Sequence, residues 1–242
     1  MYNLPVPERF FVFQDKEFRK DGEILPDGMV DEILDKVEDE RIFIKRYRGG
    51  AGSGISIAEK KSNGYYTKDG EKLSAHLIRE KYTDSNYIFE KQVVQNDAIK
   101  RFNPSSVNTI RILTYRNEII SAAIRFGGAG DICDNVSKGG VAVSVDLKTG
   151  RLGEYGMRMY DVMKYYRHPD SKIEFKDAVV PNWDSILDVV KKTMQFLPYF
   201  NSVGFDVAVS IDGPVIIEIN TGAGINLSQT GKEFGLSECF RK

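Results

Sequence analysis

The chain has 242 residues, 41% hydrophobic and 29% charged, and its 34 basic and 35 acidic side chains leave a net charge of −1. This length allows a buried core in one large domain or in two small lobes. The balanced charge gives no electrostatic reason to expect nucleic acid or an anionic membrane as the main partner. The longest apolar runs are too short to span a bilayer.

The few cysteines and histidines point away from disulfide and zinc chemistry. Cys133 and Cys239 form neither a disulfide framework nor a metal spacing, so we expect reduced thiols in a cytoplasmic protein. His76 and His168 have no ligand partner at a useful spacing. The N-terminus lacks a basic segment followed by an apolar run, and no signal peptide is expected.

The first third of the chain alternates strand and helix patterns. In order, we expect a strand at Phe10–Phe13, a helix at 28–39, a strand at Ile42–Ile44, a glycine loop at Gly49–Gly54, a strand at Ile55–Ile57 and a helix at Glu71–Lys81. A glycine loop between two strands is a hairpin. It differs from the strand–loop–helix order of dinucleotide and Walker sites.

From residue 86 onward strand patterns dominate. We expect strands at 87–94, 109–115, 119–126 and 141–145, a helix at 182–196 started by Pro181 and Asn182, and strands at 205–209 and 215–219 around Asp212-Gly213. The order predicts an α+β protein with two lobes, residues 1–90 and 91–242, and a ligand cleft where they meet.

The closing hairpin carries three oxygen-bearing side chains. Glu218 and Asn220 are two positions apart on one strand, so both project to the same face. With a turn centred on Asp212-Gly213, Asp206 falls opposite Glu218. Facing carboxylates repel unless a cation lies between them. Oxygen ligands without His or Cys suit Mg²⁺, with Mn²⁺ as a substitute. A polar row facing solvent is the alternative.

The glycine loop offers backbone amides that can approach a phosphate closely, since no Cβ intervenes. Gly50, Gly52, Ser53 and Gly54 are the candidates, and Lys45 stands just before them at the end of a strand. The alternative is a flexible hairpin with a surface lysine. Protein kinases place their lysine after the glycine loop, so a kinase of that fold is disfavoured.

Three further segments each allow more than one role. The strand at the lobe junction, with Glu90, Gln92 and Val93, either binds an adenine edge or is a plain core strand. Arg111 and Arg125 lie within apolar strands, where an unpaired guanidinium is costly. Each therefore pairs with a core carboxylate, or binds phosphate or a substrate carboxylate. The glycine-ended loop from Asp134 to Gly140 is a lid, a substrate loop or a simple surface connection.

These segments in this order resemble the ATP-grasp superfamily. The shared pieces are Lys45 with GGAGSG, then FEKQVV, GFDVAVS and IIEIN. The longer runs VNTIRILTYRNE, AAIRFG, DNVSKGGVAVSVDLKTGRLG, HPD and GFDVAVSIDGPVIIEIN look like the sugar-transfer-associated ATP-grasp proteins. The match extends over most of the chain from about residue 42. It implies a bilobed ATP-grasp fold that binds a nucleotide between two antiparallel sheets.

The resemblance also implies residue roles. Lys45 is similar to the lysine that contacts the α- and β-phosphates, Glu90 and Val93 match the adenine-side strand, and Asp206, Glu218 and Asn220 match the metal ligands. Arg111 matches an NTxR arginine that binds phosphate or acyl-phosphate. Asp134 and Asn135 match a DN pair of unassigned role. ATP-grasp enzymes usually have a further nucleotide-binding lysine and an N-terminal substrate lobe upstream of the part that matches here. Because Lys16, Lys20 and Lys36 are poorly placed to contact the nucleotide, we expect none of them to be that lysine.

The expected function is that of an ATP- and Mg²⁺-dependent ligase. A carboxylate, small or sugar-linked, attacks the γ-phosphate, and an amine or other nucleophile then displaces phosphate from the acyl-phosphate. Such relatives accompany genes for cell-surface polysaccharides. The rivals are a phosphotransferase on the same scaffold and a non-catalytic nucleotide-binding module. Phosphoryl transfer needs positioning and charge neutralisation rather than a strong base, which fits the scarcity of histidine.

Overall fold

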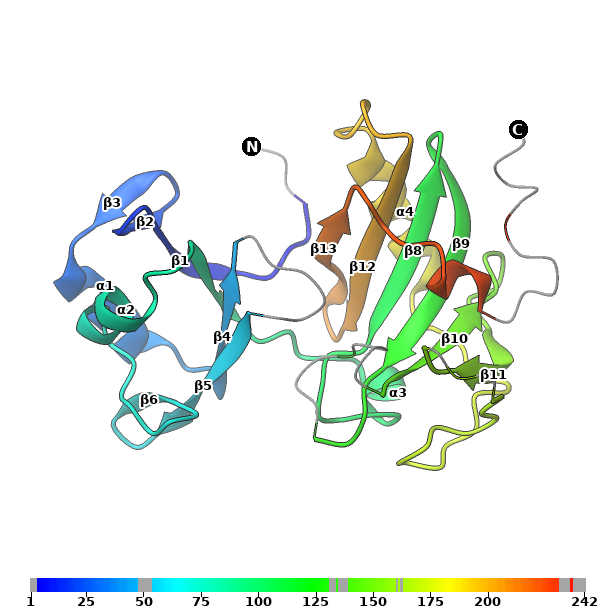
Figure 1. Ribbon diagram of the computed structural model, residues 1–242, viewed down its shortest axis with the longest axis horizontal. Coiled ribbons are helices and arrows are strands. Elements are labelled where there is room, and N and C mark those ends of the chain that lie inside the picture. The colour runs from blue at the N-terminus through cyan, green and yellow to red at the C-terminus, as the bar shows by residue number, and fades with distance from the viewer. Residues whose placement is uncertain are drawn as a thin grey trace. The chain divides into compact units, whose positions relative to one another are not determined.

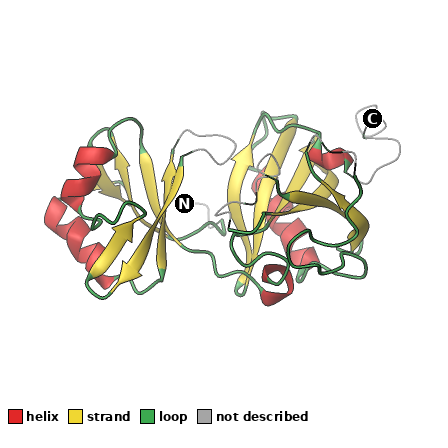
Figure 2. Cartoon of the chain, turned by 60° about the horizontal axis from the view of Figure 1, so that its bottom comes forward, coloured by secondary structure: helices red, strands yellow, loops and turns green. Residues whose placement is uncertain are grey.

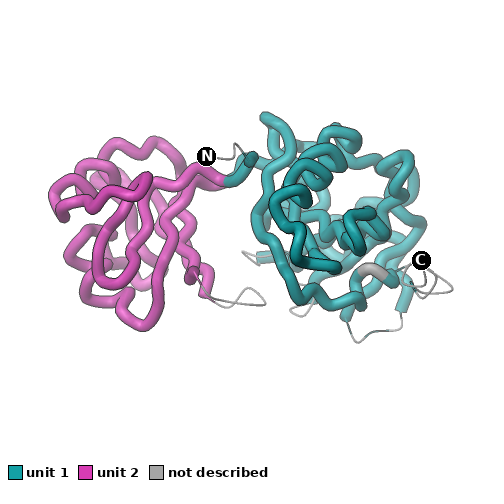
Figure 3. The backbone as a smooth tube through the Cα atoms, turned by 90° about the horizontal axis from the view of Figure 1, so that it is seen from above, with its two compact units in different colours: residues 1–6, 93–242 teal, residues 7–92 magenta. Residues whose placement is uncertain are grey.

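The computed structural model describes residues 4–47, 54–130, 134, 139–159, 161, 163–230 and 236. The chain divides into two compact units, coloured separately in Figure 3. Unit 2 is Pro7–Gln92, and unit 1 combines Met1–Val6 with Val93–Lys242. Each unit has its own antiparallel sheet and its own buried core. Among the described helices, none is long and apolar enough to cross a membrane.

Unit 2 is a seven-stranded sheet with two helices against one face (Figures 1 and 2). The strand order is β3-β2-β1-β7-β4-β5-β6, with β1 (Arg9–Gln14), β2 (Glu17–Lys20), β3 (Glu23–Leu25), β4 (Arg41–Arg46), β5 (Ile55–Lys61), β6 (Gly64–Thr67) and β7 (Tyr87–Lys91). Helices α1 (Asp27–Lys36) and α2 (Ala75–Lys81) bury Val30, Leu34 and Ile78 against this sheet. Because strand side chains alternate, the opposite face is left for Phe43 and Lys45 of β4.

Unit 1 is a six-stranded sheet covered on one face by a long helix (Figure 2). The strand order is β11-β10-β9-β8-β12-β13, with β8 (Thr109–Tyr115), β9 (Glu118–Phe126), β10 (Val141–Val145), β11 (Leu152–Met157), β12 (Ser202–Ser210) and β13 (Gly213–Asn220). The short helices are α3 (Asp97–Lys100) and the 3₁₀ turn η2 (Leu227–Gln229). Helix α4 (Trp183–Met194) packs Ile186 and Val190 into the core with Phe205 and Val207 of β12. The other face of β12 therefore carries Asp206.

Several predicted bounds were wrong for local reasons. Helix α2 begins at Ala75 rather than Glu71, since the hydroxyl of Ser74 accepts from the Leu77 amide and caps it. Strand β7 ends at Lys91, which leaves Gln92 and Val93 outside it. Asn182 precedes α4 in the left-handed conformation and makes no side-chain cap. The sequence analysis also missed four strands, which are charged, glycine-containing or short: β2, β3, β6 and β11.

The closing hairpin owes its register to a bulge. Its turn is at Ile211-Asp212, because Ser210 pairs with Gly213. Continued regularly, this register would put Asp206 opposite Ile217. The register shifts between Asp206 and Val207, so that Val207 faces Ile216 while Asp206 faces Glu218. The predicted opposition of the two carboxylates is therefore present, but the bulge produces it and the predicted turn centre was wrong.

Candidate functional site

A row of polar side chains crosses the helix-free face of the unit 1 sheet. Asp206 of β12 pairs with Glu218 of β13 on one side and with Arg111 of β8 on the other. Arg111 in turn pairs with Ala123 of β9, and Arg125 lies two positions further along that strand. Residues paired across antiparallel strands share a face. The sheet thus gathers two carboxylates and two guanidinium groups that are far apart in the sequence.

Asp206 is held by both arginines. Arg111 donates from Nε to Oδ1 at 2.5 Å and from a terminal nitrogen to Oδ2 at 3.0 Å. A terminal nitrogen of Arg125 lies 3.0 Å from the same Oδ2. The side chain of Asp206 is 2% exposed. Burial alone would raise its pKa, but the arginines, Arg125 foremost, outweigh burial and hold the pKa below its ordinary value. Of the two readings of the arginines, pairing with a buried carboxylate is what the structure shows.

Asp134 supports Arg125 from the other end. Its Oδ2 accepts from the backbone amide of Thr109 at 2.7 Å and from the Thr109 hydroxyl at 2.5 Å. The same oxygen lies 3.4 Å from Nε of Arg125. Burial raises the pKa of Asp134, and Arg125 and Thr109 oppose that rise. Two hydrogen-bond donors on one oxygen, with the charge of Arg125 beside them, favour the carboxylate form over the protonated one.

Glu218 and Asn220 complete the row without a cation of their own. Within the described part of the chain, Glu218 has no ion pair. Burial first and Asp206 second raise the pKa of Glu218. The amide nitrogen of Asn220 is buried without a hydrogen-bond partner. The Glu218 carboxylate, which has no ion pair among the described residues, and the Asn220 amide oxygen suit Mg²⁺, with Asp206 as a third oxygen ligand that the arginines share.

The strand end that carries Arg111 is itself fixed by buried amides. The side chain of Gln95 donates to the carbonyl oxygen of Asn108 at 2.7 Å and accepts from the Asn108 amide at 2.9 Å. Asn108 also donates to the Asn103 carbonyl at 2.9 Å. These bonds anchor the chain at Asn108, directly before the first residue of β8 and three residues before Arg111. The sequence analysis assigned no role to Gln95, Asn108 or Thr109, although NTxR contains two of them.

A segment after β13 folds back over this face. A Cβ added to Gly204 would lie 2.5 Å from the Cβ of Ala223 and 3.3 Å from Cδ of Arg111. The chain then reaches η2, which contacts β8 and β9. We call residues 221–230 the return strap (Figure 1). Gly204 is therefore the position that lets the strap and Arg111 approach the sheet together.

In unit 2 a second charged pair lies on the helix-free face. Nζ of Lys45 forms an ion pair with Oε1 of Glu90, and their side chains are 19% and 8% exposed. Apolar side chains that are half-buried surround the pair through the register of β1, β4, β5 and β7: Val12, Phe43, Ile55, Ile57 and Ile88. Lys45 is thus not a free surface lysine. The pair offers one cation and an apolar platform on the same face.

The glycine loop lies largely outside the described residues, including the predicted Gly50, Gly52 and Ser53. Gly54 is described: its carbonyl accepts from the Arg46 amide at 3.0 Å, and its φ of +93° favours glycine. This bond closes the β4–β5 hairpin one step beyond the pair Lys45 and Ile55, so the loop begins after Arg46, the residue that follows the lysine. Of the DN pair, Asn135 also lies outside the described residues.

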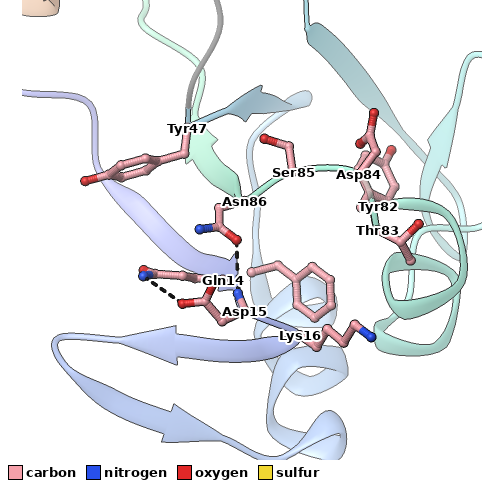
Figure 4. Close-up of a pocket in the computed structure, with 10 residues that line it drawn as sticks. Gln14, Asp15, Lys16, Tyr47, Tyr82, Thr83, Asp84, Ser85 and Asn86 are labelled. Atoms are coloured by element: carbon pink, nitrogen blue, oxygen red, sulfur yellow. Dashed lines mark hydrogen bonds between the residues drawn. The ribbon is translucent and has the colours of Figure 1, made fainter.

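Unit 2 also contains a cavity of about 580 Å³, which Figure 4 shows. It is lined by the β1–β2 turn, by Tyr47 and by the segment from Tyr82 to Asn86. In the figure the side chain of Asn86 points to the backbone of Asp15, whose amide donates to it at 3.0 Å. None of the predicted site residues lines this cavity. It is separate from the Lys45–Glu90 pair.

Two antiparallel sheets, each with a charged helix-free face, define an ATP-grasp fold. The sequence matches the family described as "Sugar-transfer associated ATP-grasp" over residues 2–242, and the chain belongs to that family. This confirms the resemblance on which the predicted fold depended. No protein of curated function matches the sequence.

The solved structures that resemble the chain are distant from it in sequence. The ATP-grasp ligase PsnB complexed with minimal precursor is 12% identical with a TM-score of 0.44, and the match covers 96% of this chain and 52% of that chain. The D-alanine–D-alanine ligase from Bacillus anthracis is 12% identical with a TM-score of 0.46, and the match covers 93% of this chain and 54% of that chain. A RimK domain ATP-grasp protein from Sphaerobacter thermophilus DSM 20745 is 10% identical with a TM-score of 0.47, and the match covers 93% of this chain and 57% of that chain. The chain spans about half the length of these structures.

Proposed function

We propose that the protein is an ATP- and Mg²⁺-dependent carboxylate ligase that works through an acyl-phosphate, in the synthesis of cell-surface polysaccharide or sugar conjugates. Membership of the ATP-grasp family supports an ATP-dependent enzyme of the ligase type. The observation that carries the proposal is the row Glu218–Asp206–Arg111 on one sheet face, which has oxygen ligands for a cation beside guanidinium groups for an anion.

In unit 2 the proposed task is nucleotide binding. Lys45 supplies the point charge for phosphate, and the apolar platform around it suits the faces of an adenine ring. Glu90 holds the ammonium of Lys45 near the sheet until phosphate oxygens replace or share that contact. The amides of the glycine loop that follow Lys45 are the proposed further phosphate donors.

In unit 1 the proposed task is charge neutralisation at the reacting phosphate. A bound Mg²⁺ supplies charge neutralisation and orientation of phosphate oxygens. Arg111 is fixed by Asp206 in a bidentate contact, so its guanidinium group keeps one orientation. An arginine held in this way can bind the substrate carboxylate or the phosphoryl oxygens without first losing conformational freedom.

Calorimetry of Mg-ATP binding tests the assignment. Glu218→Ala should lose the metal-dependent part of the affinity, because it removes the carboxylate without an arginine partner. Lys45→Ala should lose nucleotide affinity with or without Mg²⁺. The exposed side chains Glu154 and Lys20 give matched controls, and Glu154→Ala and Lys20→Ala should bind like the wild type. Equal binding by all five proteins contradicts the site.

Product analysis separates ligation from phosphate transfer. A ligase releases ADP only when a carboxylate and a nucleophile are both present, and it joins them. A phosphotransferase on the same scaffold leaves a stable phosphorylated product instead. Binding of Mg-ATP without turnover over a broad pool of sugar acids, amino acids and amino sugars would support a non-catalytic nucleotide-binding module and contradict the ligase.

A further inference from the structure

The proposed reaction assigns no role to Asp134. One residue, Arg125, connects its carboxylate to Asp206, a proposed ligand of the cation. Asp134 contacts Arg125, and Arg125 contacts Asp206. The side chain of Asp134 is 11% exposed, and its Oδ2 receives both the amide and the hydroxyl of Thr109. The two hydrogen bonds from Thr109 fix the buried carboxylate of Asp134 in place, so this carboxylate can in turn position Arg125.

Arg125 is held at two ends. Its Nε makes an ion pair with Asp134 at 3.4 Å but no hydrogen bond with any described residue. A terminal nitrogen donates to the Thr109 hydroxyl at 2.5 Å, which itself donates to Asp134, and the same nitrogen lies 3.0 Å from Oδ2 of Asp206. That oxygen also accepts from Arg111 at 3.0 Å. Two guanidinium groups therefore compete for the carboxylate oxygen that a cation would need.

The charges decide what Asp134 does. Arg111 and Arg125 face three carboxyl groups, those of Asp134, Asp206 and Glu218, so the cluster has one net negative charge when all three are ionised. Removing the charge of Asp134 leaves the cluster neutral and leaves Arg125 with Asp206 as its remaining anionic contact. Both changes oppose binding of a divalent cation at Asp206 and Glu218.

We propose that Asp134 is a positioning residue that holds Arg125 away from full engagement with Asp206, so that Asp206 can share a divalent cation with Glu218 and Asn220. The inference rests on the proposed function for the identity of the site, and on the contacts of Thr109 and Arg125 for its geometry. Asp134 itself touches neither the cation nor the nucleotide.

The first experiment needs no ligand. Hydrogen exchange of the arginine Nε–H groups is followed by NMR in the wild type, in Asp134→Asn and in Asp188→Asn, which removes an exposed acidic side chain of α4. The Nε–H of Arg125 should exchange at least about tenfold faster in Asp134→Asn, because the neighbouring carboxylate, whose negative charge keeps hydroxide away from Nε, is gone. Asp188→Asn should leave it unchanged. An unaltered Arg125 rate in Asp134→Asn overturns the proposal.

The second experiment separates positioning from a merely structural role. Mn²⁺ binding is titrated by electron paramagnetic resonance, and ADP binding is measured in EDTA. Asp134→Asn should weaken Mn²⁺ about tenfold, while metal-free ADP binds equally well or more tightly because the face is less negative. A structural lesion would weaken both. Parallel losses, or an unchanged Mn²⁺ affinity, contradict the proposal.

Two substitutions that leave the charge unchanged test the proposal if the Asp134→Asn variant does not fold. Thr109→Val removes the hydroxyl that lies between Asp134 and Arg125, and Thr109→Ser keeps it. We expect faster Arg125 exchange in the valine variant and wild-type exchange in the serine variant, and equal behaviour of the two contradicts the proposal. A wild type that binds no Mn²⁺ would refute the proposed function, while the exchange rates still decide whether Asp134 positions Arg125.

Discussion

The two helix-free sheet faces solve the same electrostatic problem in different ways. In unit 2 one ammonium, that of Lys45, meets one carboxylate, that of Glu90. In unit 1 one carboxylate, that of Asp206, meets two guanidinium groups, and Glu218 remains without a cation. The first face is balanced, and the second has one spare negative charge once the carboxylate of Asp134, which pairs with Arg125, is counted with those of Asp206 and Glu218. A balanced pair suits a group that exchanges partners with phosphate, and an unbalanced cluster suits a site completed by a metal ion.

The faces also differ in how far water can replace a lost partner. Lys45 is 19% exposed, and its flexible stem can turn the ammonium to solvent. Asp206 is 2% exposed and each arginine 12%, and their planar groups are fixed by several bonds. Loss of a partner should therefore cost more in unit 1 than in unit 2.

The largest expected effect is that of Asp206→Ala. It leaves the guanidinium groups of Arg111 and Arg125 buried without a shared carboxylate, which should lower the free energy of unfolding of unit 1 by about 3–5 kcal/mol. Trp183, the single tryptophan, lies in α4 and reports unit 1 alone during urea unfolding. Asp206→Asn retains an acceptor and should lose less. A loss below about 1 kcal/mol in Asp206→Ala would show that water reaches the arginines.

Glu90→Gln is the matched change in unit 2. Glutamine still accepts a hydrogen bond from Lys45, but the charge is gone, and we expect unit 2 to lose about 2 kcal/mol. Hydrogen exchange of β4 and β7 measured by mass spectrometry follows unit 2 without a tryptophan. Nucleotide should bind Glu90→Gln at least as tightly as wild type if adenine does not contact Glu90, because Lys45 is released. A loss as large as that of Asp206→Ala would remove the distinction between the two faces.

Gly204→Ala tests how closely the return strap is seated in unit 1. The added Cβ would lie 2.5 Å from Ala223 and 3.3 Å from Arg111, so the strap must move. The expected loss is about 1–2 kcal/mol, the usual effect of overpacking. Ala223→Gly in the same chain should restore most of it, since the clash is then gone. Independent, additive effects of the two changes would show that the strap does not rest on Gly204.

Much of the fold could be predicted because strand alternation is local. Val207 and Val209 alternate with Asp206 and Ala208 along β12, which is enough to predict one apolar and one polar face. The order of Lys45, the glycine loop, FEKQVV and the closing hairpin indicated the superfamily, and the longer runs between residues 107 and 220 indicated the family. These features involve neighbours in the sequence.

What escaped prediction depends on contacts between distant residues. The bulge that brings Glu218 opposite Asp206 has no sequence signature, and regular pairing would have put Ile217 there. The contact of Asp134 with Thr109 spans 25 positions, so its role could not be read from the DN pair. Asn182 adopts the left-handed conformation that asparagine tolerates better than most residues, and there it makes no side-chain cap, contrary to the helix-start rule used for the prediction.

The smallest expected effect is a difference in pH dependence between the units. His168 of unit 1 is 2% exposed; its Nε2 faces the Gly127 carbonyl at 3.1 Å, and its Nδ1 accepts from the amides of Asp170 and Ser171, both at 3.3 Å. Because Nδ1 is an acceptor, this network requires the neutral ring. Burial lowers the pKa of His168 below its ordinary 6.5.

The direction in which stability changes with pH follows from how many protons the folded and unfolded chains bind at His168. Between the lowered folded pKa and 6.5 the unfolded chain binds a proton at His168 that the folded chain does not, so stability falls as the pH falls through this window. The slope for one proton is at most about 1.4 kcal/mol per pH unit. Urea unfolding followed by Trp183 should show the decline in wild type and a flatter profile in His168→Gln. His76→Gln, whose side chain is 91% exposed in unit 2, should retain the wild-type profile. An unchanged slope in His168→Gln would assign the acid sensitivity of unit 1 to its carboxylates instead.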